Sequence, residues 1–177
     1  MKIGLFFGSF NPMHIGHKVI ASYLAEFSDL EKVVFVVSPQ NPFKEKKSLL
    51  NQQHRLQIIR AEVEDNEILD VSDIEFKMPQ PSYTIDTLVR LKEQHPTNDY
   101  ALIMGADNLQ NFHKWKNYEQ ILEDYSIYVY PRPDIEINGS HENIHIVKGV
   151  PQMEISAQLI TSIDLKPQKN KKKLWKE

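Results

Sequence analysis

The beginning of the chain limits the fold more than any other segment. An apolar run over residues 3–7 stops at Gly8, which is the pattern of a strand buried on both faces. After Gly16, apolar residues recur at helical spacing through residues 17–27, and a second apolar run covers residues 32–38. This order predicts a right-handed βαβ unit. The turn after the first strand therefore lies at the carboxyl edge of a parallel sheet, where open α/β proteins bind ligands.

That turn reads Gly-Ser-Phe-Asn-Pro-Met-His-Ile-Gly-His over residues 8–17, and its chemistry suits phosphate. A helix N-terminus presents unpaired N–H groups and partial positive charge to an anion. His14 and His17 are three residues apart and can share a face of the first helical turn. Gly16 lets a ligand approach the backbone. Two surface histidines beside a turn would be the alternative, but the preceding strand and the complete string favour a phosphate site.

The same string resembles the signature of the His-x-Gly-His nucleotidyltransferases. Further segments make residues 1 to about 156 similar to the bacterial nicotinate-nucleotide adenylyltransferases. The resemblance implies transfer of AMP from ATP to nicotinate mononucleotide, with ATP accompanied by Mg²⁺ and with no metal held by a carboxylate cage. It also implies that His14 and His17 are catalytic and bind the transferring phosphates. The neighbouring positions that it places at ATP are Gly8, Ser9 and Phe10.

Three later segments complete the ATP side that the resemblance implies. Gly105 and Asp107 follow an apolar run and match the family's Gly-x-Asp segment at the adenosine, although Asp107 could simply cap a helix. Arg132, between two prolines, matches an ATP-contacting position. Ser156 is the second residue of the family's third motif, Ile-Ser-[Ser/Ala]-Thr-x-Ile-Arg, which begins at Ile155. In this chain Gln158 replaces the Thr of that motif and Thr161 replaces its Arg.

The acceptor side is implied by a second group of segments. Pro-Ser-Tyr-Thr at residues 81–84 matches the family's segment at the nicotinate carboxylate, so Tyr83 and Thr84 are assigned to the substrate. Ser82 or Thr84 could instead cap the following helix. Trp115 can stack on the pyridine ring or cover the core. Lys44 matches a basic position on a loop over the site, or is a solvated lysine in a charged cluster.

Other patterns suggest structural roles. His141 and His145 form a His-Glu-x-x-His sequence, but alternating apolar residues after it predict a strand, on which the two histidines cannot share one zinc ion. His54 and Arg55, on a helical segment, are expected to hold helix to sheet. Residues 68–71 and 74–76 have the pattern of strands.

Composition narrows the class of protein. The 177 residues suffice for one domain, which we expect over residues 1–165, followed by a Lys-rich tail over 166–177. Without that tail the net charge changes from −3 to −8, which argues against nucleic acid as a partner. The absence of cysteine, of a signal peptide and of 18 consecutive apolar residues indicates a cytoplasmic protein without a membrane partner. A homo-oligomer is possible.

We therefore predict one doubly wound, Rossmann-like α/β domain whose mainly parallel sheet has five or six strands. The expected partners are ATP and nicotinate mononucleotide. One alternative is a sister transferase that uses nicotinamide mononucleotide or pantetheine phosphate. Another is a nucleotide-binding protein with impaired turnover, because Gln158 and Thr161 remove a hydroxyl and a cation from the phosphate side.

Overall fold

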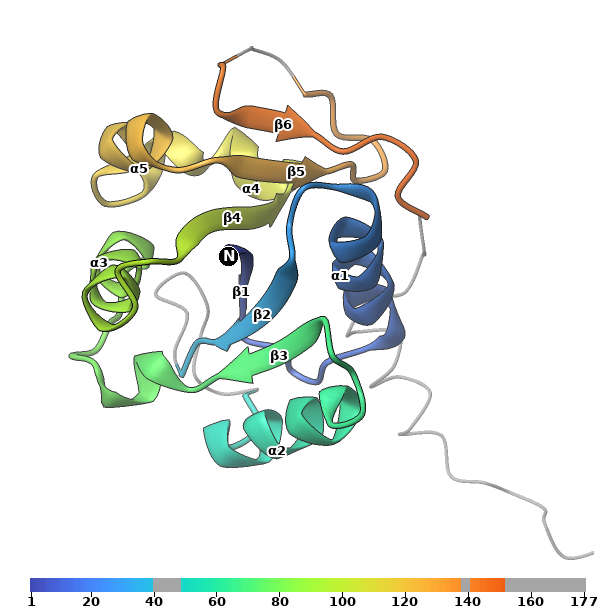
Figure 1. Ribbon diagram of the computed structural model, residues 1–177, viewed down its shortest axis with the longest axis vertical. Helices are drawn as coiled ribbons and strands as arrows, with labels where there is room; N and C mark the ends of the chain where they lie inside the picture. The colour runs from blue at the N-terminus through green and yellow to red at the C-terminus, as the bar shows by residue number, and fades with distance from the viewer. Residues whose placement is uncertain (40–48, 138–140, 152–177) are drawn as a thin grey trace, which may run out of the picture.

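A computed structural model describes residues 1–39, 49–137 and 141–151, and in this part of the chain six parallel strands form one sheet. The strand order is β3-β2-β1-β4-β5-β6, so the predicted doubly wound, Rossmann-like fold is confirmed. Helices pack on both faces of the sheet (Figure 1). The strands are β1 (Lys2–Gly8), β2 (Lys32–Val37), β3 (Leu69–Ser72), β4 (Asp99–Gly105), β5 (Ile127–Tyr130) and β6 (Ile144–Ile146).

The sheet separates two hydrophobic cores, because successive side chains of a strand point to opposite faces. On one face, Phe6 and Phe35 pack with apolar residues of α1 (Ile15–Phe27) and α2 (Gln52–Val63). On the other face, Leu5 and Leu102 pack against α3 (Thr84–Gln94) and α5 (Tyr118–Asp124). A short helix, α4 (Ala106–Gln110), and a 3₁₀ turn, η3 (Phe112–Lys114), lie on this second face after β4.

The strand order reverses between β1 and β4, and this reversal positions the site. The chain leaves β1 toward α1 on one face and leaves β4 toward α4 on the other, so the loops at the two carboxyl ends diverge. A crevice at such a reversal is where doubly wound proteins bind nucleotides. The turns after Gly8 and Gly105 both open into it.

One predicted strand is wrong. Residues Ile74–Lys77 form a 3₁₀ helix, η2, in which the Phe76 amide donates to the Asp73 carbonyl (2.9 Å). On a strand, the Glu75 side chain would point to the opposite face of the sheet from the side chains of Ile74 and Phe76. The turn instead buries the Glu75 side chain, where hydroxyl groups bind its carboxylate.

The His-Glu-x-x-His sequence does not lie on a helix. His141 precedes a turn, and His145 is the central residue of β6. In the described ranges no three His, Asp or Glu side chains gather as a metal site would require. No helix of that part of the chain has the length and apolar character needed to cross a membrane.

Candidate active site

The turn after β1 is shaped by close packing around two glycines. Phe10 has a left-handed backbone (φ 44°), and its ring is buried against Gly8, where an added Cβ would lie 3.0 Å from the ring. At Gly16 an added Cβ would lie 3.0 Å from His14 Nδ1. The ring of Phe10 therefore belongs to the core, and only the backbone of Phe10 can face a ligand.

His14 and His17 lie together at the start of α1, as their spacing predicted. His14 is the N-cap residue, and the two imidazole rings stack with their centroids 3.7 Å apart. The His14 amide donates to Nδ1 of His17 (3.2 Å), so a neutral His17 carries its proton on Nε2. That tautomer can donate a hydrogen bond to an oxyanion. Edge contacts with Phe6 and Phe10 hold the His17 ring in place.

Burial lowers the pKa of His14 below its ordinary value of 6.5, and the charge of Arg132 lowers it further. His14 is therefore neutral near pH 7 in the free protein. A bound anion would favour the imidazolium and raise this pKa.

We expect an NMR titration to reveal this coupling. The His14 Cε1–H resonance should titrate below pH 6.5 in the free protein and at higher pH in sulfate, because the anion offsets the effects of burial and Arg132. Sulfate is a useful probe since it does not itself titrate between pH 5 and 8, and the spectrum of His14→Gln identifies the signal. A His14 pKa at or above 6.5 without sulfate would contradict the prediction.

Across the crevice, Arg132 lies just after β5, where Asp107 of α4 and Tyr130 of β5 hold its side chain. Its Nε lies 3.4 Å from Asp107 Oδ1, and its Nη2 donates to the Tyr130 hydroxyl (3.3 Å). The guanidinium also lies over the Tyr130 ring, 5.2 Å from its centroid. Gly105 permits the ion pair, because a Cβ there would lie 2.3 Å from Asp107 Oδ1. Asp107 is not the N-cap of α4; Gly105 takes that position.

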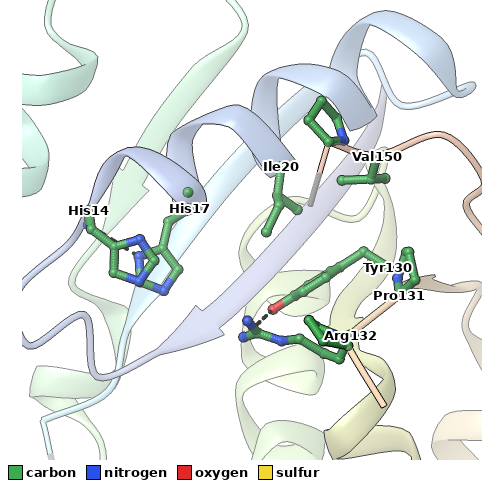
Figure 2. A pocket seen from close by; sticks show the side chains of 10 residues that line it. His14, His17, Ile20, Tyr130, Pro131, Arg132 and Val150 are labelled. Carbon is green, nitrogen blue, oxygen red and sulfur yellow. Dashed lines mark hydrogen bonds between the residues drawn. The ribbon is translucent and has the colours of Figure 1, made fainter. Parts of the chain in front are cut away.

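The histidines and Arg132 line one cleft at the surface of the protein. Figure 2 shows the His14 and His17 rings at the start of α1, at one end of this cleft, and the Arg132 guanidinium, hydrogen-bonded to Tyr130, on the other side. Ile20, Val150 and Pro131 form apolar walls. Two imidazoles, a guanidinium and a helix N-terminus around a half-apolar cleft can hold a phosphate ester.

Two of the residues assigned to the acceptor lie at the start of α3. Tyr83 is the N-cap residue and Thr84 the first helical residue; neither Ser82 nor Thr84 caps the helix with its side chain. That interpretation was wrong because Ser82 donates to Glu75 instead. Lys116 lies over the Tyr83 ring (4.9 Å) and pairs with Asp86 (2.9 Å), which brings the Trp115 segment beside this helix.

Trp115 is half-buried, and its ring meets Phe112 edge-on at 5.4 Å. It packs on the core beneath the second sheet face while leaving part of the indole exposed. Both roles considered for Trp115 are therefore compatible with its position.

Two buried charged residues near the site were not predicted as part of it. Arg55 was predicted only to hold helix to sheet, and Glu75 was predicted to lie on a strand. Both are almost completely buried. The sequence does contain a signal for both: each is a charged residue within a segment whose apolar residues have helical or strand-like spacing.

Four positions of the sequence analysis lie outside the described residues. They are Lys44, on the connection after β2, and Ser156, Gln158 and Thr161 in the altered third motif. The tail over residues 166–177 also lies outside them.

Comparisons with known proteins identify relatives of this chain. Residues 5–163 match the profile of the cytidylyltransferase-like family. The chain is 51% identical to a probable nicotinate-nucleotide adenylyltransferase of Flavobacterium johnsoniae, over 90% of this chain and 84% of the relative. It is 48% identical to a protein of the same name from Flavobacterium psychrophilum, over 99% and 95%. A solved structure of Plasmodium falciparum nicotinic acid mononucleotide adenylyltransferase complexed with NaAD has a TM-score of 0.68 at 18% identity, covering 77% of this chain and 67% of that one.

Proposed function

This chain belongs to the cytidylyltransferase-like family, and we propose that it transfers AMP from ATP to nicotinate mononucleotide, releasing pyrophosphate and forming nicotinate adenine dinucleotide. The observation that carries the proposal is the cleft in which the stacked His14 and His17 face Arg132. Two relatives of about 50% identity, matched over 84% and 95% of their length, are named as probable nicotinate-nucleotide adenylyltransferases.

The chemistry requires positioning rather than a protein nucleophile. An oxygen of the acceptor phosphate forms a bond to the α-phosphorus of ATP, and the bond from that phosphorus to the bridging oxygen breaks. Pyrophosphate leaves with the electron pair. Because the attacking phosphate is already ionised, no side chain has to remove a proton. His14 and His17 donate to oxygens that gain charge, and Arg132 binds the nucleotide from the opposite wall.

Mg²⁺ belongs to this proposal as the counterion of ATP. It prefers a few oxygen ligands and retains water, so the phosphates of the nucleotide can supply most of its coordination. The Asp107 carboxylate is already paired with Arg132, so we do not assign it to the ion. When bound, the ion would neutralise charge on the departing pyrophosphate.

Tyr83, Thr84 and Trp115 are proposed to bind the nicotinate end of the acceptor. The first turn of α3 has no side-chain cap, so its N–H groups suit a carboxylate, and the exposed part of Trp115 suits a flat ring. Nicotinamide mononucleotide lacks that carboxylate and should be the poorer acceptor.

A coupled assay of pyrophosphate release tests the proposal. With ATP and Mg²⁺, nicotinate mononucleotide should give a kcat/KM at least about tenfold above that of nicotinamide mononucleotide, the difference expected for one charge-assisted hydrogen bond. Pantetheine phosphate should give none. Equal values for the two pyridine nucleotides would contradict the carboxylate site. Nucleotide binding without turnover of any acceptor would favour a binding protein.

A further inference from the structure

Arg55 is a buried cation on a helix face that is otherwise apolar. Its side chain is 1% exposed, and the other buried residues of α2 are Leu56, Ile59 and Val63. Within the described residues no carboxylate forms an ion pair with it. Burial lowers its pKa, because the charged form loses its hydration. A buried charge without a counterion has to be solvated by the groups that its hydrogen bonds reach.

The Arg55 guanidinium donates to four main-chain carbonyls. Nη1 bonds those of Ser9 and Ser38, with 2.8 Å to the latter. Nη2 bonds that of Pro39 and Nε bonds that of Leu50, each at 3.0 Å. One planar group thus joins three segments of the chain: the turn after β1, the residues that follow β2 and the residues that precede α2.

Two further hydrogen bonds tie the same segments to the turn over residues 8–14, which we call the phosphate turn. The Ser38 amide donates to the Gly8 carbonyl, and the Leu50 amide donates to Oδ1 of Asn11, each at 2.9 Å. The phosphate turn is therefore held at its beginning and middle by the two segments that Arg55 joins. A set of polar groups bonded on several sides in this way is rigid.

The bond from Arg55 to Ser9 also orients the next amide. The Ser9–Phe10 peptide is trans, so its carbonyl oxygen and its N–H point in opposite directions. Since the carbonyl points to Arg55, the Phe10 N–H points away from it, and this N–H has no hydrogen-bond partner within the described residues. The left-handed backbone of Phe10 (φ 44°) is unfavourable for a residue with a Cβ, so the turn needs such support.

We propose that Arg55 is a positioning residue for the nucleotide: it holds the Ser9 carbonyl inward, and thereby presents the Phe10 amide to a phosphate oxygen of ATP. The inference rests on the proposed function, in which the phosphates of ATP bind at this turn. A donor that is already oriented needs no reorganisation when the phosphate arrives. The charge of Arg55 acts in the same direction, because no described carboxylate offsets it and a buried charge is little screened by salt.

The unmodified protein tests the orientation of the Phe10 amide. With ATP and Mg²⁺ but no acceptor, we expect the amide proton resonance of Phe10 to move downfield and its exchange with solvent to slow about tenfold, because it gains a charge-assisted hydrogen bond. Adenosine, which lacks the phosphates, should cause neither change. A Phe10 amide that does not respond to saturating ATP would overturn the proposal, whether or not any variant folds.

Arg55→Lys tests the role of the guanidinium. Lysine keeps the charge but has no planar fork, so it cannot bind four carbonyls at once. We expect kcat/KM for ATP to fall at least about tenfold, the loss of one charge-assisted hydrogen bond, and the response of the Phe10 amide to ATP to shrink. The calorimetric Kd of nicotinate mononucleotide, measured alone, should change less than about twofold, because no bond of Arg55 reaches α3.

Ile59→Ala is the matched control for stability. Ile59 is fully buried on α2, one turn after Arg55, so its truncation should lower Tm while the bonds to the phosphate turn remain. Its kcat/KM for ATP should stay within about twofold of that of the unmodified protein. An equal loss in Ile59→Ala at a similar Tm, or an unchanged value in folded Arg55→Lys, would overturn the proposal. Absence of pyrophosphate release with every acceptor would instead refute the proposed function, since the Phe10 measurement needs no acceptor.

Discussion

Replacing His14 or His17 with alanine should lower kcat by roughly 10²–10³, the loss typical of one preorganised donor to a developing charge. The two rings stack at 3.7 Å at the start of α1, and His17 is oriented by the amide of His14. Removing either imidazole therefore takes away a donor and the stacking contact of its neighbour, although the amide hydrogen bond to His17 remains in His14→Ala. The loss should appear in single-turnover rates of pyrophosphate release at saturating ATP and nicotinate mononucleotide.

The fold should survive both substitutions, because most of the α1 packing lies further along the helix, at Ile20, Ala21 and Leu24. His54→Ala is a suitable control. His54 is exposed on α2, next to Arg55, and its removal should leave kcat near that of the unmodified protein. Near-full turnover of either cleft variant, with Tm unchanged, would remove the histidines from the mechanism.

Much of the fold follows from runs of apolar residues that end at a glycine. Residues 3–7 and 100–104 are long enough to be recognised as central strands, and the glycines at 8 and 105 mark where the chain turns into the crevice. The prediction was wrong for residues 74–76, where alternation of apolar and acidic residues resembles an edge strand. The hydroxyls of Ser82 and Thr87, seven and twelve residues further along the chain, bind the Glu75 carboxylate inside the protein, and the alternation over residues 74–76 does not indicate them.

The site, like the fold, was predicted only in part from the sequence. His14 and His17 were predicted to lie together because both belong to one turn, and local spacing controls that geometry. The pairing of Asp107 with Arg132 was not predicted, since it depends on two neighbouring strands ending at the same height. The bonds of Arg55 to Ser9 and Ser38 depend likewise on three segments packing together. Their roles in binding and catalysis stay predictions.

Replacing Arg132 with methionine should raise the KM for ATP and leave the KM for nicotinate mononucleotide nearly unchanged. Loss of one charge-assisted contact to a phosphate costs about 1–3 kcal/mol, or roughly 5- to 150-fold in affinity. Arg132 is well placed for this contact because Asp107 and Tyr130 hold its guanidinium at the cleft wall. Initial rates with each substrate varied in turn separate the two KM values.

Gly105→Ala tests the same contact without removing the charge. Its Cβ would lie 2.3 Å from Asp107 Oδ1 and 3.2 Å from Arg132 Nε, so the ion pair has to move away from its present place. We expect the KM for ATP to rise in the same direction as in Arg132→Met but less, because the guanidinium is displaced and not lost. Arg60→Met is the matched control: it removes an exposed Arg–Asp pair (3.8 Å to Asp73), and such surface pairs contribute little. If Arg132→Met left the KM for ATP unchanged, or raised both KM values equally, Arg132 would be a support of the cleft wall and not a ligand of the nucleotide.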